Sequence, residues 1–377
     1  MKPGRREFIK SVSTASALFG MTVDAESGAP QPEARVKMPS PRAKSLMELF
    51  GLKYPIFEAP IGTQSCPELA IAVSNAGAMG ALAAFAFSDS EGAHRAVSRV
   101  RSGTKGNFFV NFVLQFEPTA LQAVLDAGAP IVQFSWGIPT KEMIAAVRAA
   151  GAKLGMQVTS AESTRAALDL GADFLVCQGT EAGGHVQATR TLYETLPIVL
   201  EVARDKPVVA AGGIGNGYGI YKALAAGASG AVLGTRFVAT AESFAHEDYK
   251  RALVAAHAKD TALTICFQDG WSAAHRVLRN RTFVMWETAG CLSPGKRPGE
   301  HDTIARRADG SLILRYEDTG PRRGFTGSVT ECPMWAGTSV ELVKDLPNAA
   351  ELVERLWGEC LAASSVGDVV ESTPRRE

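Results

Sequence analysis

The sequence predicts an α/β fold, a (β/α)8 TIM barrel with a C-terminal excursion over the barrel mouth. Eight short apolar runs, each followed by a stretch of helical periodicity, recur through the middle of the 377-residue chain. Several of the predicted helices end in an Ala-Gly-Ala or similar turn, where glycine tolerates a positive φ. Alternating strands and helices indicate a parallel sheet, and eight units favour a closed barrel over the alternative, an open doubly wound sheet.

The predicted barrel strands follow one another along the chain at similar spacing. They are Pro55–Ala59, Gly80–Phe85, Asn107–Leu114, Ile131–Ser135, Lys153–Val158, Phe174–Gln178, Pro207–Ala211 and Gly230–Leu233. After Thr235 this alternation stops. There we expect a helix over Ala241–Ala258, strands over Thr264–Asp269 and Thr282–Trp286, and a returning helix over Ser339–Leu356.

These patterns divide the chain into four parts. Residues 1–35 form an export signal and linker, residues 42–245 the barrel, residues 246–335 an insertion or lid, and residues 336–377 a C-terminal helix and tail. The Pro-, Gly- and charge-rich stretch Pro294–Gly324 lies within the lid. We therefore expect a single large barrel rather than two ordinary domains.

Composition excludes several classes of partner. Lys and Arg together number 39 and so do Asp and Glu, so no net field favours nucleic acid or an anionic membrane surface. The six cysteines form no C-x-x-C pair and have no histidine at zinc-finger spacing, which predicts no metal site. A disulfide between Cys291 and Cys332 can be imagined but does not follow from the spacing.

The N-terminus resembles a twin-arginine export signal. Arg5-Arg6-Glu7-Phe8-Ile9-Lys10 precedes a weakly apolar, uncharged run rich in Ser and Ala, from Ser11 to Val23. A stable membrane anchor would need roughly 20 strongly apolar residues. We therefore expect a partnership with the twin-arginine export machinery and a periplasmic protein, or a cytoplasmic one if the arginine pair only begins an amphipathic helix.

The loops after the seventh and eighth predicted strands have the composition of a phosphate-binding site. The seventh strand ends in the Gly-rich run Ala211–Gly217 and the eighth in Leu233-Gly234-Thr235-Arg236. Glycine lets backbone N–H groups approach phosphate oxygens, and in TIM barrels these two loops commonly bind phosphate. Neither loop has the lysine of a P-loop or a complete G-x-G-x-x-G, so a separate dinucleotide-binding domain is not indicated.

The sixth predicted strand leads into the segment Gln178–His185, which carries the predicted chemistry. The Gln178 amide can meet the edge of a heterocycle, and Gly183-Gly184 allows a tight turn beside a planar ring. His185 follows where a barrel site places an acid or base. Glu181 is either a second base or a carboxylate that holds the loop.

In combination and order, the chain resembles the nitronate monooxygenase family, also called 2-nitropropane dioxygenases, which is related in fold to flavin enoyl-acyl-carrier reductases. The resemblance runs from about Ser45 to Trp357. The matching segments are Pro55–Ile61, Ser74–Gly77, Val110–Phe112, Gln178–His185, Ala210–Ile214, Gly234–Phe237, Arg279–Asn280 and Ala336–Ser339.

The resemblance implies an FMN cofactor and a role for each matching residue. Ala59, Pro60 and Ile61 would lie along the flavin, and Asn111 and Gln178 would bond to its ring or side chain. The ribityl phosphate would be held by Gly183, Gly213, Gly234 and Thr235, and His185 would be the catalytic base. Two positions depart from the family: Glu58 stands where Gln is usual and Ile61 where Met is usual.

The activity implied is oxidation of alkyl nitronates, such as propionate 3-nitronate, by FMN and O₂ to a carbonyl compound and nitrite. The partners would be this small-molecule substrate and O₂. One alternative is an FMN-dependent NAD(P)H reductase of a quinone or an enoyl thioester. Another is a flavin-binding accessory protein without catalysis. The sequence leaves the physiological substrate and the oligomeric state open.

Overall fold

The computed structural model describes residues 38–87 and 89–369, with side chains described up to residue 365. The predicted export signal and linker, residues 1–35, lie outside the described residues. None of the helices in the described ranges has the length and apolar composition needed to cross a membrane.

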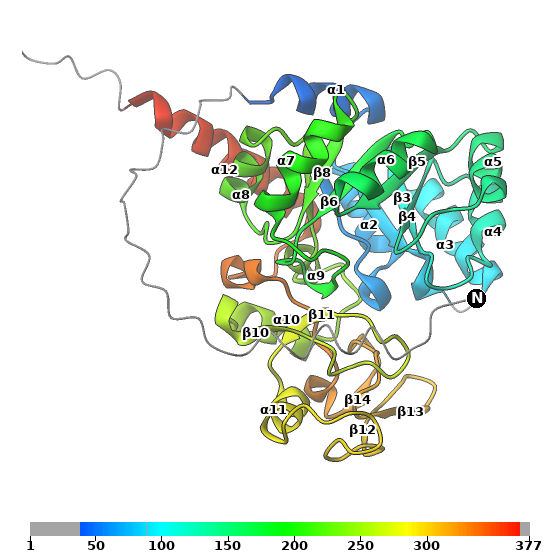
Figure 1. The fold of residues 1–377 in the computed structure, drawn as a ribbon, viewed down its shortest axis with the longest axis vertical. Coiled ribbons are helices and arrows are strands. Elements are labelled where there is room, and N and C mark those ends of the chain that lie inside the picture. Colours follow the sequence, from blue (N-terminus) through cyan, green and yellow to red (C-terminus); the bar gives the residue numbers. More distant parts are fainter. Residues whose placement is uncertain (1–37, 88, 370–377) are drawn as a thin grey trace, which may run out of the picture. The chain divides into compact units, whose positions relative to one another are not determined.

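Eight parallel strands form a nearly closed barrel, which confirms the predicted fold (Figure 1). They are β1 (Ile56–Glu58), β2 (Gly80–Ala83), β3 (Phe108–Val113), β4 (Ile131–Ser135), β5 (Lys153–Val158), β6 (Phe174–Gln178), β8 (Val208–Ala211) and β9 (Gly230–Leu233). Their order is β1-β9-β8-β6-β5-β4-β3-β2. A parallel bridge between Phe57 and Met79 joins the two end strands.

Side chains fill the inside of the barrel. Every second residue of the strands points inward, so Phe57, Phe109, Phe174 and Val209 meet in one buried cluster. Gly155 makes room for this packing, because a Cβ there would lie 2.3 Å from the Phe174 ring. Helix α1 (Pro41–Phe50) covers this cluster from one end, with the Phe50 ring 5.3 Å from that of Phe174. The barrel is therefore a packed core without a pore.

Helices cover the outside of the barrel. They are α2 (Pro67–Asn75), α3 (Ser90–Gly103), α4 (Leu121–Asp126), α5 (Lys141–Ala149), α6 (Ala161–Asp169), α7 (Leu192–Ala203), α8 (Gly217–Ala225) and α12 (Ala349–Val369). The glycines of the predicted helix-ending turns all have a positive φ: Gly77, Gly128, Gly151, Gly171 and Gly227. Helix α12 packs on α8 and α2, and the Glu359 carboxylate accepts a hydrogen bond from the Gly217 N–H at 2.8 Å. The end of the chain thus returns to the barrel.

The excursion between the barrel and α12 contributes short helices and two small antiparallel sheets. Its elements are α9 (Thr235–Val238), α10 (Glu247–Ala255), β10 (Thr261–Thr264), β11 (His275–Leu278), α11 (Arg281–Thr288), β12 (Thr303–Arg306), β13 (Leu312–Leu314) and β14 (Thr326–Gly327). One sheet has the order β10-β11-β7, where β7 is Gly184–His185, and the other β13-β12-β14. Figure 1 shows α11 and β12–β14 on the side of the barrel away from α1.

Two of the predicted strands in the excursion are wrong. The observed strand is Thr261–Thr264 rather than Thr264–Asp269, and Thr282–Trp286 lies within α11. The Asn280 side chain decides the second case, because it accepts a hydrogen bond from the Phe283 N–H at 3.0 Å and so caps the helix. A short apolar run does not distinguish strand from buried helix by its periodicity.

Two predicted helices begin later than expected. Helix α10 begins only at Glu247, after the His246 side chain accepts a hydrogen bond from the Asp248 N–H. The predicted returning helix Ser339–Leu356 is divided into a 3₁₀ helix, Thr338–Leu342, and α12 from Ala349. Pro347 lies between the two parts.

The cysteines are unpaired. All six are free thiols, and Cys291 is exposed while Cys332 is buried, so the disulfide imagined between them is not formed.

Candidate active site

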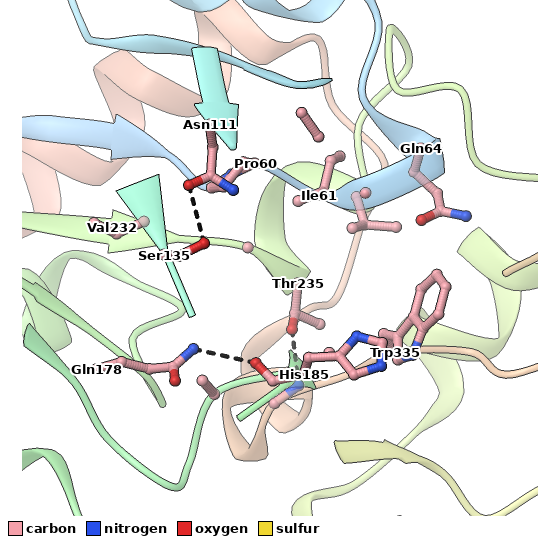
Figure 2. Close-up of a pocket in the computed structure, with 18 of the residues that line it drawn as sticks. Pro60, Ile61, Gln64, Asn111, Ser135, Gln178, His185, Val232, Thr235 and Trp335 are labelled. Atoms are coloured by element: carbon pink, nitrogen blue, oxygen red, sulfur yellow. Dashed lines mark hydrogen bonds between the residues drawn. The ribbon is translucent and has the colours of Figure 1, made fainter. Parts of the chain in front are cut away.

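A pocket opens at the carboxyl ends of the barrel strands (Figure 2). Nine of the ten residues predicted for the site line it: Pro60, Ile61, Asn111, Gln178, Gly183, His185, Gly213, Gly234 and Thr235. The tenth, Ala59, does not line it, and its backbone N–H donates instead to the Leu233 carbonyl at 2.9 Å. Loops that are far apart in the sequence meet here because parallel strands all end on the same side of a barrel.

The glycine-rich loops bring bare backbone to the wall of the pocket. Gly213 has a φ of 68°, and a Cβ there would lie 3.0 Å from the Glu181 Cβ. A Cβ on Gly183 would lie 2.5 Å from the Gly337 nitrogen, and that nitrogen donates to the Thr235 hydroxyl at 2.9 Å. These close contacts leave little room for side chains at Gly183 and Gly213, so backbone groups and the Thr235 hydroxyl form this part of the wall.

Two side-chain amides lie on the pocket wall (Figure 2). The Ser135 hydroxyl donates a hydrogen bond to Asn111 Oδ1 at 3.2 Å. The NH₂ group of Asn111 takes no part in this contact. Gln178 Oε1 accepts from the Gln187 N–H at 2.8 Å, and its Nε2 donates to the His185 carbonyl at 3.3 Å. Gln178 therefore also holds the loop that carries His185, a role that the sequence did not indicate.

Three further contacts hold the His185 loop. The Glu181 carboxylate accepts a hydrogen bond from the Leu192 N–H, the first of α7, at 2.9 Å. The Arg276 guanidinium donates to the Thr180 carbonyl at 2.8 and 3.1 Å. Strand β7 pairs with β11, which sets His185 opposite His275. Of the two roles considered for Glu181, the geometry favours the loop-holding one.

Asp318 is the neighbour of His185 that sequence reasoning missed. Its Oδ2 lies 3.3 Å from His185 Nε2, and the side chains of His185 and Asp318 are only 13% and 5% exposed. Asp318 belongs to the irregular stretch after β13, where no periodicity or motif marks a functional residue. Only the folded excursion brings this carboxylate to the histidine.

Aromatic rings surround the same histidine. The Trp271 indole stacks on the His185 imidazole with centroids 3.9 Å apart and an interplanar angle of 23°. The His275 ring lies 5.4 Å from His185. Burial lowers the pKa of His275 to about 4, and its Nε2 accepts a hydrogen bond from the Phe267 N–H at 3.3 Å. His275 is therefore a neutral structural residue beside the site.

Glu58 does not line the pocket. Its carboxyl group is fully buried and accepts a hydrogen bond from the Ala81 N–H at 3.0 Å. Next to it, the Ser65 hydroxyl donates to the Ala81 carbonyl and accepts from the Ala83 N–H, both at 3.3 Å. These two side chains continue the hydrogen bonding of β2 where β1 leaves the barrel. Burial raises the pKa of Glu58 well above its usual value, which favours the neutral acid.

The described part of the structure contains no cluster of metal-ligating side chains. Within residues 38–87 and 89–369, no group of three or more His, Cys, Asp or Glu side chains is placed to hold a metal ion.

Known sequences are similar to this chain over most of its length. The family model described as nitronate monooxygenase matches residues 43–123 and 115–359. The nitronate monooxygenase of Pseudomonas aeruginosa is 32% identical over 362 residues, which cover 82% of this chain and 97% of that protein. A carboxyl-CoA dehydrogenase of Mycobacterium tuberculosis is also 32% identical, over 339 residues that cover 82% and 94% of the two chains.

Solved structures share the fold as well. The nitroalkane oxidase of Streptomyces ansochromogenes superimposes with a TM-score of 0.69 and 32% identity, covering 85% of this chain and 99% of that one. FabK of Thermotoga maritima superimposes with a TM-score of 0.71 and 27% identity, covering 87% and 99%.

Proposed function

Because the chain belongs to the nitronate monooxygenase family and is an oxidoreductase, we propose that it uses FMN and O₂ to convert nitroalkanes and their nitronates to carbonyl compounds and nitrite. The observation that carries the proposal is the meeting of His185 with the glycine-lined loops of β8 and β9 in one pocket. The likeness to a nitroalkane oxidase supports the same reaction class.

The residues present fit FMN. The loops around Gly213 and Gly234 would offer backbone N–H groups to a phosphate at the pocket wall, and Thr235 would add a hydroxyl. Asn111 and Gln178 offer amide groups to the edge of a flavin ring. When bound, FMN would supply the redox chemistry by taking electrons from the substrate and passing them to O₂.

His185 would act as the base. Asp318 Oδ2 lies 3.3 Å from Nε2, so the tautomer with its proton on Nε2 would leave Nδ1 to accept the α-proton of a neutral nitroalkane. The Asp318 carboxylate then faces the imidazolium that forms and stabilises its charge. Gln178 and Arg276 keep the loop of His185 in place during this step.

The test is oxygen uptake and nitrite release by the FMN-loaded protein. We expect both when nitroethane or its nitronate is added. A protein that carries flavin but consumes no O₂ and forms no nitrite with any nitroalkane contradicts the proposal.

A second candidate follows from the Mycobacterium relative, whose name is that of a carboxyl-CoA dehydrogenase. A reductase or dehydrogenase of a thioester or quinone would exchange electrons with NAD(P)H. It predicts rapid anaerobic bleaching of the flavin by NADPH or NADH, whereas the nitronate reaction predicts bleaching by the nitroalkane. A purified protein without a flavin spectrum would favour a third candidate, an accessory protein without catalysis.

Export by the twin-arginine route is a separate proposal. It is supported by Arg5-Arg6 and the uncharged run that follows. Replacement of both arginines by lysine should retain the full-length protein in the cytoplasm, as measured by cell fractionation. Equal periplasmic yields from the two versions would contradict this route.

A further inference from the structure

Two segments of the excursion reach His185 together. One carries Trp271, whose indole stacks on the His185 imidazole with ring centroids 3.9 Å apart. The other carries Asp318, whose Oδ2 lies 3.3 Å from His185 Nε2. The segments are paired through Asp269, whose N–H donates to the Tyr316 carbonyl at 3.2 Å and whose carbonyl accepts from the Asp318 N–H at 2.9 Å. The positions of both pocket side chains therefore depend on where Asp269 lies.

A buried arginine holds Asp269. Arg297 Nη2 donates to both carboxylate oxygens of Asp269, at 2.7 and 2.9 Å, and the Arg297 side chain is only 1% exposed. Its Nε donates to the Glu300 carboxylate at 3.0 Å. The guanidinium also lies over the Tyr316 ring, 4.3 Å from the centroid. One side chain thus contacts the Asp269 segment and the Tyr316 segment at once.

Tyr316 has a strained backbone conformation. Its φ of 73° lies in the left-handed region, which a bulky residue rarely adopts, and its side chain is fully buried. Strain of this kind persists only where the surrounding contacts determine it, and it is concentrated at functional sites. The contact with Arg297 supplies such a constraint, and so does the hydrogen bond from the Tyr316 hydroxyl to the Pro298 carbonyl at 2.7 Å. Both contacts act two residues before Asp318.

Stability alone does not account for this buried arginine. Apolar side chains of similar size often replace a buried ion pair with no loss of stability. Arg297 Nη1 is itself buried without a hydrogen-bond partner among the described residues, which is unfavourable. A guanidinium offers what an apolar side chain does not, a directional charged contact that fixes a carboxylate in one place. The arrangement therefore indicates a role in the geometry of the pocket.

We propose that Arg297 is a positioning residue of the active site that acts through Asp269. It fixes Trp271 against the face of the His185 imidazole, and with it Asp318 beside Nε2. The inference rests on the proposed function, in which His185 removes a proton from the substrate. A base must lie within hydrogen-bond reach of that proton, and a displacement of about 1 Å can cost on the order of 100-fold in rate.

Hydrogen exchange measures the positions of the two segments without substrate. In the purified flavoprotein, Arg297→Met should raise the amide exchange rates of residues 267–273 and 316–319 about tenfold or more, while those of β5 stay unchanged. Asp269→Ala should do the same. This second variant changes a side chain that is 41% exposed, so it avoids removing a buried group. Unchanged exchange of both segments in the two variants overturns the proposal.

Kinetics test whether the effect reaches the proton transfer. Arg297→Met and Asp269→Ala should each lower kcat/KM for neutral nitroethane about tenfold or more. The rate with preformed ethyl nitronate, which needs no base, should change less than about threefold. Equal losses with the two forms of the substrate would mean that Arg297 only supports the shape of the excursion, and the positioning role would be wrong.

A double variant and a matched control complete the test. Because Arg297 acts through Asp269, the double variant should lose no more than about twice what the larger single loss is, rather than the product of the two. A full product overturns the route through Asp269. Glu287→Ala is the control, since Glu287 pairs with Arg279 in the same excursion and is 42% exposed, close to Asp269. It should leave both the exchange of the two segments and the kinetics unchanged.

The outcomes distinguish this inference from the proposed function. A protein whose two segments are released by Arg297→Met, but which forms no nitrite from any nitroalkane, keeps the positioning role and loses the proposed reaction. A protein that oxidises nitroethane with the same kcat/KM in the parent and in both variants keeps the reaction and overturns the inference.

Discussion

Asp318 Oδ2 lies 3.3 Å from His185 Nε2, although one residue follows the sixth barrel strand in sequence and the other comes from the excursion. The Asp318 side chain is 5% exposed, and Trp271 covers one face of the imidazole. A carboxylate so close to an imidazole favours a proton on the nearer ring nitrogen. The excursion therefore contributes a carboxylate to the pocket at the barrel mouth.

Replacement of Asp318 by Asn should slow proton abstraction. We expect kcat/KM for a neutral nitroalkane to fall about 10- to 100-fold, because the imidazolium that forms loses the negative charge 3.3 Å from Nε2. The rate with preformed nitronate, which needs no deprotonation, should change little. Oxygen uptake with both forms of the same substrate measures the difference. Asp302→Asn, at an exposed aspartate of the same excursion, is the control.

An equal loss with nitroalkane and nitronate would mean that Asp318 only supports the shape of the pocket. That result would remove it from the proton-transfer step.

Removal of the imidazole itself should have a larger effect. His185→Ala should lower kcat/KM for the neutral nitroalkane by about 100- to 10,000-fold, the usual contribution of a positioned general base. His257→Ala is a matched control, since that histidine is 55% exposed and lies 4.0 Å from Glu341. Steady-state oxygen uptake measures both variants. An unaffected rate in His185→Ala would exclude the histidine as the base.

The barrel could be predicted from the sequence because its signals are local. Each strand is a short apolar run, and the glycines that end the helices have the positive φ expected of them. The loops after strands six, seven and eight could be predicted for the same reason, since the topology alone brings Gln178, Gly213 and Thr235 to one end.

The excursion could not be predicted in the same way. Thr282–Trp286 suits a strand or a helix equally, and only the Asn280 cap decides between them. Asp318 lies in irregular backbone, where its N–H donates to the Asp269 carbonyl at 2.9 Å, and no local pattern indicates that it approaches His185. Glu58 departs from the family pattern in the sequence. Its contact with the Ala81 N–H could not be predicted, because it depends on where β1 leaves the barrel.

A side chain in the glycine loop should weaken cofactor binding. Gly213→Ala imposes a left-handed backbone on alanine, at a cost of about 1–2 kcal/mol, and pushes against Glu181. We expect the dissociation constant for FMN to rise at least tenfold, measured by flavin fluorescence on rebinding to apoprotein. Gly310→Ala is the matched control, because its φ is 85° and a Cβ there meets nothing within 4 Å.

Comparable FMN affinities in the Gly213 and Gly310 variants would mean that the substitution in the pocket has no specific effect on FMN binding. The phosphate role of this loop would then be wrong.

Glu58 should make the protein less stable as the pH rises. Burial raises the pKa of Glu58 in the folded protein. Below about pH 4.5 the carboxyl group is neutral in both the folded and the unfolded chain, so its contribution to the free energy of unfolding is at its full value. Above that pH the unfolded chain ionises and the folded one does not. The free energy of unfolding therefore falls by about 1.4 kcal/mol for each pH unit until the folded pKa is reached.

Glu58→Gln removes this slope and keeps an oxygen that can accept from the Ala81 N–H. Its NH₂ group would be unpaired, as Glu58 Oε1 is among the described residues, which costs a pH-independent 1–3 kcal/mol or so. Urea unfolding between pH 4.5 and 8 should therefore show the variant gaining on the parent protein as the pH rises, while Glu354→Gln, on the exposed face of α12, follows the parent. A difference in the free energy of unfolding between the Glu58 variant and the parent that stays constant across this range would mean that Glu58 is ionised in the folded barrel. The contact between Glu58 of β1 and Ala81 of β2 would then contain a buried charge.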